Sequence, residues 1–239
     1  MMKQMTLTRA FLALPLVLTL ALAGCGNDPN RGAGNTLLKD ITQVLRKTVS
    51  KGSNKGGAQT DAQVAQLVPL ALKRVKGSAL LALLNDGKQV AVLGEQENRA
   101  GYMTYTTTER QTLTLRGGII TSSRGLGGDL MSSSVDETAR LVRARSAGQG
   151  QRVMRFLTGD WQEVGLSFAC RVSRDQAETI PTATRGNVQT QRMIEICRST
   201  SGGTTFTNIY WVSGGGTIWQ SRQWLGNDNG YIAVSLLRP

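Results

Sequence analysis

The sequence contains no histidine in its 239 residues. Histidine is the base of Ser-His-Asp and Cys-His nucleophile pairs, so both kinds of catalytic centre are excluded. The usual histidine-bearing zinc sites are excluded as well, and so is the side chain that most often changes charge near neutral pH. We therefore predict no catalytic residues, no metal site and no enzymatic activity.

Long apolar runs are confined to one stretch near the start of the chain. Lys3 and Arg9 form a positive n-region, residues 10–21 form an apolar core, and Leu22-Ala23-Gly24-Cys25 follows. A secretory h-region has ~7–15 apolar residues, whereas a membrane-spanning helix needs ~20. We therefore predict a cleaved signal peptide at residues 1–24.

The ending Leu22-Ala23-Gly24-Cys25 resembles the lipobox of bacterial lipoproteins. This resemblance implies that the Cys25 thiol receives a diacylglyceryl group and that the new amine is acylated, commonly with palmitate. Two or more acyl chains hold a protein durably on a membrane. By the sorting rule of such lipoproteins, Gly26 in place of Asp favours the outer membrane and its periplasmic face. The covalent lipid on Cys25 is the only cofactor we expect.

Cysteine is scarce, and lipidation of Cys25 leaves Cys170 and Cys197. An even remainder in an oxidising compartment predicts one disulfide, which would stabilise the fold by roughly 3–4 kcal/mol. Two buried free thiols are the alternative. The pair lacks the Cys-x-x-Cys spacing of redox catalysts, so we expect a structural role.

Acidic residues are few, with Asp+Glu at 16 against Lys+Arg at 28 and a net charge of +12. A basic exterior attracts phosphates and carboxylates. No nucleic acid is expected in the periplasm, so lipopolysaccharide phosphates and acidic polysaccharides are the candidate polyanions. A solubilising surface charge without a single partner is the alternative, because the charges are scattered.

The chain divides into a signal peptide at 1–24, a lipidated tether at 25–60 and a β-rich domain at 61–239. Within the tether, the spacing of apolar residues predicts a short amphipathic helix over 36–49. Thr60-Asp61-Ala62-Gln63 has the form of a capping box, which predicts a helix that Pro69 ends or kinks.

From residue 78 onward, β-branched residues, aromatic residues and turn signals predict strand after strand. An Asp-Gly turn predicts a hairpin of 79–84 with 88–94, and residues 135–145 suit a short helix. Residues 173–187, which include Pro181, are predicted to form a polar loop. The further predicted strands are 102–107, 112–116, 119–123, 151–158, 163–172, 188–199, 204–212, 217–225 and 231–237.

The most distinctive internal stretch is the glycine-rich segment 124–131, which begins at Arg124 and contains Asp129. It lacks the Gly-Lys-Ser/Thr ending of a phosphate-binding loop, so a structural turn is favoured over a ligand loop. Asp129 is placed to accept hydrogen bonds from nearby backbone amides.

Tryptophans 219 and 224 are five residues apart and point to opposite faces of one regular strand. Core packing is therefore favoured over a flat sugar-stacking platform. Arg222 and Trp224 share a face, and a contact with a sugar acid is a hypothesis for this pair. Together with Arg124 and Asp129, they are our candidate glycan or partner contacts.

Three segments resemble the YjbF/GfcB family of capsule- and exopolysaccharide-associated lipoproteins. They are residues 64–69 with the hairpin LALLNDGKQVAVLG, the stretch GGIITSSRGLGGDLM, and the tail GTIWQSRQWLGNDNGYIAVSLLRP with its W-x-S-x-Q-W core. The resemblance implies a mainly β fold of strongly curved, partly closed, barrel-like antiparallel sheets with few helices. It also implies a role in polysaccharide production or export beside export proteins, and it brings no catalytic residues.

Three functions remain open. The leading hypothesis is a non-catalytic accessory lipoprotein for exopolysaccharide or capsule production. The second is a carrier of lipid or another hydrophobic ligand, which a deep apolar pocket would favour and a filled core would oppose. The third is a glycan-cleaving enzyme, which needs two carboxylates ~5–10 Å apart in a cleft. The available acids are Asp129, Asp136, Glu137, Asp160 and Glu163.

Overall fold

The computed structural model describes residues 57–84, 89–158, 160 and 162–239. The predicted helix at 36–49, the anchor residue Cys25, the first hairpin turn and Trp161 lie outside these residues.

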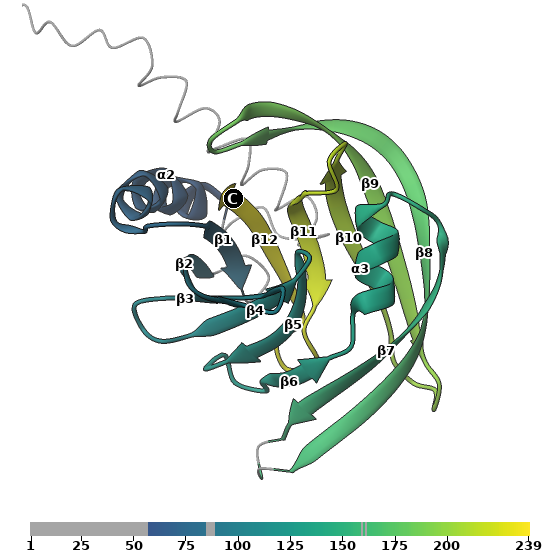
Figure 1. The fold of residues 1–239 in the computed structure, drawn as a ribbon. Helices are drawn as coiled ribbons and strands as arrows, with labels where there is room; N and C mark the ends of the chain where they lie inside the picture. Colours follow the sequence, from purple (N-terminus) through teal and green to yellow (C-terminus); the bar gives the residue numbers. More distant parts are fainter. Residues whose placement is uncertain (1–56, 85–88, 159, 161) are drawn as a thin grey trace, which may run out of the picture.

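Twelve strands form one antiparallel sheet that curls into a nearly closed barrel (Figure 1). The helices are α2 (Gly57–Arg74) and α3 (Asp136–Arg143). The strands are β1 (Ala79–Leu84), β2 (Gln89–Arg99), β3 (Tyr102–Thr106), β4 (Thr112–Arg116), β5 (Ile119–Arg124), β6 (Leu130–Ser133), β7 (Gly148–Leu157), β8 (Glu163–Thr182), β9 (Gly186–Ser199), β10 (Thr205–Ser213), β11 (Ile218–Trp224) and β12 (Tyr231–Arg238). The mainly β, barrel-like prediction is confirmed.

The strand order is β5-β4-β3-β2-β1-β12-β11-β10-β9-β8-β7-β6. The first and last strands therefore pair in the middle of the sheet, with Leu81 opposite Ser235. The two terminal strands of the order, β5 and β6, follow each other in the chain and come into contact. This contact forms the seam of the barrel.

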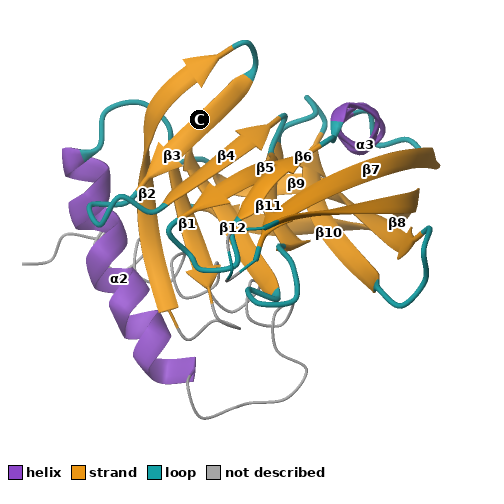
Figure 2. Cartoon of the chain, turned by 90° about the horizontal axis from the view of Figure 1, so that it is seen from below, coloured by secondary structure: helices purple, strands orange, loops and turns teal. Residues whose placement is uncertain are grey.

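Strand β1 is buried on both faces, which explains its uninterrupted apolar sequence. Leu80 and Leu84 face the barrel interior, where they join the main core. Leu81 and Leu83 face outward and pack under α2 with Val68. Figure 2 shows α2 lying along the outside of the sheet beside β1 and β2. The predicted hairpin is confirmed by the pairing of β1 with β2.

Helix α2 differs from its prediction at both ends. It begins at Gly57, ahead of the predicted capping residue Thr60, and it continues through Pro69 to Arg74. Arg238 of β12 donates from Nη1 to Leu72 O at 3.1 Å and from Nε to Gly77 O at 2.6 Å, and it also contacts Val75 O. A positive charge beside the last carbonyl groups stabilises the C-terminal end of a helix. These contacts with Arg238 offset the free-energy cost of Pro69 inside the helix.

The prediction of a polar loop at 173–187 is wrong, because most of this segment is strand. Strand β8 continues to Thr182 and β9 begins at Gly186, so only a short turn separates them. Strand β7 pairs with β8 only as far as Val172, so the rest of β8 is paired on one side alone. Pro181 is tolerated there because no ladder partner is needed on the free side.

The other strand predictions are confirmed apart from small shifts at the ends, except that β2 continues past its predicted end at Gly94 to Arg99. One strand was missed, because β6 begins at Leu130 inside the segment predicted as a glycine-rich turn. Helix α3 confirms the helix predicted at 135–145 and packs against β7, β8 and β10 on the concave side of the sheet. None of the helices in the described ranges is both long and apolar enough to span a bilayer.

Candidate functional site

Arg124 and Asp129 lie together at the seam between β5 and β6. The Arg124 guanidinium donates to Leu130 O at 3.0 Å, which ties the end of β5 to β6. The Asp129 carboxylate accepts from the amides of Gly125 and Leu126 at 2.8 and 3.1 Å and from the Ser123 hydroxyl at 3.1 Å. The prediction that Asp129 satisfies nearby amides is confirmed, and a glycan or partner contact by this pair stays a prediction.

Arg222 and Trp224 have different neighbours. The Trp224 ring is 7% exposed and stacks on Phe206, with a centroid distance of 4.6 Å. The Arg222 guanidinium lies over the Tyr231 ring, 3.3 Å from its centroid. The structure therefore places Trp224 in the core and leaves Arg222, which is half-buried, as the more accessible of the two.

Trp219 and Trp224 belong to different apolar clusters, as the prediction of opposite faces requires. Trp219 packs with Trp211 and Ile180, whereas Trp224 belongs to the interior core. Both indoles are nearly covered by protein. Core packing is therefore the role of both rings.

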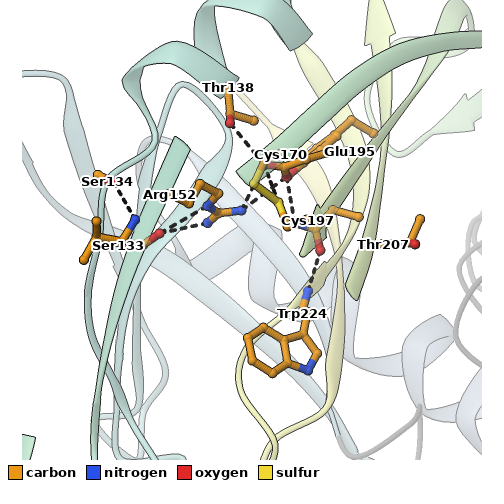
Figure 3. Close-up of a disulfide and its surroundings, with 12 residues drawn as sticks. Ser133, Ser134, Thr138, Arg152, Cys170, Glu195, Cys197, Thr207 and Trp224 are labelled. Carbon is orange, nitrogen blue, oxygen red and sulfur yellow. Dashed lines mark hydrogen bonds and ion pairs between the residues drawn. A yellow bond between two sulfur atoms is a disulfide. The ribbon is translucent and has the colours of Figure 1, made fainter. Parts of the chain in front are cut away.

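Cys170 and Cys197 form a disulfide, which confirms the predicted pairing. The two residues are directly opposite each other on the neighbouring strands β8 and β9. Figure 3 shows that the bond lies beside a cluster of polar side chains inside the barrel. The sequence patterns described above do not predict this cluster.

Glu195 is the centre of the buried polar cluster and is 0% exposed. Its Oε2 accepts from Arg152 Nη1 at 3.2 Å, from Asn208 Nδ2 at 2.8 Å and from the Tyr210 hydroxyl at 2.7 Å. Its Oε1 accepts from the Thr138 hydroxyl of α3 at 3.0 Å. The carboxylate thus links β7, β9 and β10 to α3.

Burial and two neighbouring charges act on the pKa of the Tyr210 phenol. Burial raises the pKa of its phenol well above 10.0, and the nearby Glu195 charge raises that pKa further, while the Arg152 charge opposes both. Arg152 is 2% exposed and also donates from Nη2 to the Ser133 hydroxyl at 2.9 Å. The cluster is therefore a neutralised and hydrogen-bonded core, which is the usual requirement for buried charges.

The cluster has one feature of a metal site. Ligand atoms of Cys170, Glu195 and Cys197 lie within 4.8 Å of one another. However, the two sulfurs are bonded to each other and the Glu195 carboxylate is occupied by four protein donors. The disulfide form therefore has no thiolate to offer a cation, and the Arg152 charge opposes one.

The carboxylates considered for glycan cleavage have different partners within the described residues. Asp129 is held by the seam, Asp136 pairs with Arg116, Glu163 pairs with Arg155, and Asp160 accepts from Thr158. Glu137 lies on α3 beside Gly150. Each acid thus has its own structural neighbours.

The barrel interior is largely filled by side chains, but a pocket remains at one mouth. Its volume is ≈ 360 Å³, and it is lined by β1, β2, β3, β4, β11 and β12 together with Arg143 of α3. Ser78 and Tyr105 each contribute a hydroxyl to the lining, and their Oγ and Oη atoms lie 2.8 Å apart. Burial raises the pKa of the Tyr105 phenol.

Comparison with solved structures identifies the class of fold. The crystal structure of the hypothetical lipoprotein YmcC from Escherichia coli superposes with a TM-score of 0.64 at 18% identity, covering 80% of this chain and 98% of that one. An exported protein with a YmcC-like fold from Bacteroides fragilis gives 0.34 at 10% identity, covering 67% and 93%. A lipoprotein from Parabacteroides distasonis gives 0.32 at 11%, covering 69% and 95%. The superposition on YmcC, with its TM-score of 0.64, shows that the chain has the YmcC-like barrel fold.

The family follows from the sequence. Residues 35–237 match the family model YjbF, described as group 4 capsule polysaccharide lipoprotein gfcB. The chain belongs to this family, which confirms the resemblance noted in its three segments. A comparison with curated protein sequences gives no significant match.

Proposed function

We propose that this protein is a lipoprotein of the outer membrane that faces the periplasm and acts as a non-catalytic accessory factor in capsule or exopolysaccharide production or export. In this proposal residues 1–24 are removed, residues 25–60 tether the protein and residues 61–239 form the working domain. Its partners are the membrane, through the lipid on Cys25, and proteins of the export system.

The match of residues 35–237 to the capsule lipoprotein family carries the proposal. The Leu22-Ala23-Gly24-Cys25 ending supports lipid attachment independently, because the matched residues begin after it. Gly26 supports transfer to the outer membrane by the sorting rule of such lipoproteins. A non-catalytic role is supported by the absence of histidine and by the separate neighbours of the candidate acids.

The decisive experiment measures extracellular and surface polysaccharide in a strain that lacks the gene. We expect the polymer to fall and wild-type protein to restore it, whereas Cys25→Ala does not. Gly26→Asp tests the membrane separately, because this variant keeps its lipid and is expected to fractionate with the inner membrane.

Immunoblots must show equal amounts of each variant. Unchanged polymer in the deletion strain, under conditions where the wild type makes it, would contradict the proposed role. Full restoration by Cys25→Ala would instead contradict only the need for an anchor.

A contact with acidic polysaccharide is a further part of the proposal, supported by the basic composition. Arg222→Ala is expected to weaken binding of acidic oligosaccharides to the purified protein. Arg198→Ala is the matched control, since Arg198 is an exposed arginine on the neighbouring part of the sheet. Trp224→Ala is less informative for glycan binding, because this ring is buried in the core. Equal affinity of wild type and Arg222→Ala would rule out the Arg222 contact.

A further inference from the structure

We propose that the pocket at the mouth of the barrel binds an anionic single-chain amphiphile. The aliphatic chain lies in the pocket and the head group lies beside Arg143. This inference goes beyond the proposed function and does not depend on it.

The wall of the pocket is suited to an alkyl chain. Its apolar lining comes from five strands whose side chains point into the barrel: Leu80, Met103, Leu115, Ile218, Val234 and Leu236. A volume of ≈ 360 Å³ is near the lower end of the roughly 300–1,000 Å³ of small-molecule sites. The space therefore suits a single aliphatic chain.

Glycines keep the entrance open. Gly101, Gly117, Gly118 and Gly216 all border the pocket, so part of its mouth is made of backbone without side chains. Gly118 has φ +87°, and a Cβ there would lie 2.9 Å from the Ile218 side chain. A larger residue at this position would be strained and would press on the lining.

Arg143 supplies the charge for the head group. It lies in the last turn of α3, is exposed, and donates from Nε to Gly216 O at 3.2 Å. Within the described part of the chain, its Nη atoms make no hydrogen bond or ion pair. A guanidinium with free Nη atoms binds carboxylate or phosphate through two parallel hydrogen bonds. The pocket thus combines an apolar interior with one positive group at its rim.

The test is isothermal titration calorimetry on the chain from residue 25 with Cys25→Ala, which needs no detergent. The probes are saturated carboxylates of increasing chain length, below their micellar concentrations. We expect one site per chain and about a fourfold gain in affinity per buried methylene, or about 0.8 kcal/mol. The gain stops once the pocket is full. Affinity that rises with length without a plateau would indicate non-specific partition and overturn the proposal.

Head-group chemistry is tested with matched probes of one chain length. Dodecanoate and dodecyl phosphate are expected to bind more tightly than dodecanol, and their ranking distinguishes a fatty acid from a phosphate amphiphile. Arg143→Gln is expected to weaken both anions about tenfold and to leave dodecanol unchanged. Arg140→Gln on the same helix is the control, since Arg140 is exposed and does not line the pocket. Equal losses in both variants would remove Arg143 from the site.

Leu236→Trp fills the pocket and is expected to abolish binding. Ile209→Trp is the control, because Ile209 is a partly buried strand residue outside the pocket.

A second measurement uses the wild-type protein, so a folding defect of a variant cannot affect it. A fatty acid with a spin label on its chain should broaden the methyl signal of Met103, which lines the pocket, and spare that of Met131 in β6. Equal broadening of both signals, or unaltered binding by Leu236→Trp, would overturn the proposal.

Discussion

Arg152 and Glu195 form an ion pair inside the barrel, with 3.2 Å between Nη1 and Oε2 and exposures of 2% and 0%. They come from β7 and β9, two strands that are separated in the sheet by β8. The pair therefore bridges three strands under α3. Desolvation of two charges is costly, so such a pair is sustained by the hydrogen bonds around it rather than by the charge attraction alone.

Glu195→Gln is expected to lower the free energy of unfolding by about 3–5 kcal/mol, because the variant leaves Arg152 buried without a counter-charge. Guanidinium chloride unfolding measures this change. Glu163→Gln is the control, since its pair with Arg155 is about half exposed and worth about 0–1 kcal/mol. Equal effects of the two substitutions would contradict the distinct role of the buried pair.

Removal of the disulfide is expected to destabilise the fold. Cys170 and Cys197 are 27 residues apart, and the chain-entropy model assigns such a loop about 3.5 kcal/mol. The Cys170→Ala/Cys197→Ala double variant should show this loss in chemical unfolding. The wild type should lose similar stability with dithiothreitol, to which the double variant is insensitive. A wild type unaffected by dithiothreitol, once thiol counting confirms reduction, would contradict this expectation.

Tyr210 is expected to make stability fall at alkaline pH. Its folded-state pKa is raised above the 10.0 of the unfolded chain, so folding favours the protonated phenol. The stabilisation of the fold by the protonated Tyr210 is complete below about pH 10 and is lost as the pH rises above that value. Urea unfolding across this range should show the fall in wild type and a shallower fall in Tyr210→Phe.

At neutral pH Tyr210→Phe should also cost about 1.5–3 kcal/mol, because the charged Glu195 loses a hydrogen bond. Tyr102→Phe, at an exposed position, is the control for the alkaline measurement. An unchanged pH slope in Tyr210→Phe would show that other groups cause the alkaline loss.

Asp129→Ala is expected to open the seam of the barrel. The substitution removes the acceptor for two backbone amides and for Ser123, at a cost of about 1–3 kcal/mol. Hydrogen exchange should then quicken in β5 and β6 and stay unchanged in β1 and β12. Uniform acceleration across the sheet would mean that the loop acts on global stability and not on the seam.

Local patterns predicted most of the strands because each strand has a short-range signal. The run Ala79–Leu84 and the turn after it define a hairpin, and the pairing of β1 with β2 agrees with it. The loop prediction at 173–187 failed because polar residues and Pro181 are compatible with a strand that lacks a partner on one side. The part of α2 past Pro69 accepts a hydrogen bond from Arg238, at the far end of the chain, and no local pattern could predict that contact.

The interior polar cluster was harder to predict. Glu195 alternates with Met193 and Cys197 on one face of β9, and this spacing is the one sequence signal that an acid points inward. Its partners Arg152, Asn208 and Tyr210 come from other strands, so their meeting depends on the closure of the sheet. The pocket likewise arises from six separate strands.

The half of β8 that lacks a neighbouring strand on one side affects whether copies of the protein aggregate at high local concentration. Beyond Val172 this strand has no neighbouring strand along one edge, and such an edge is the usual starting point for edge-to-edge aggregation. Pro181 lacks a donor, the register is irregular between Arg174 and Ala177, and charged side chains including Asp175 line the strand. These features deter pairing with a second copy. We therefore expect this edge of β8 to stay unpaired when copies of the protein are crowded together.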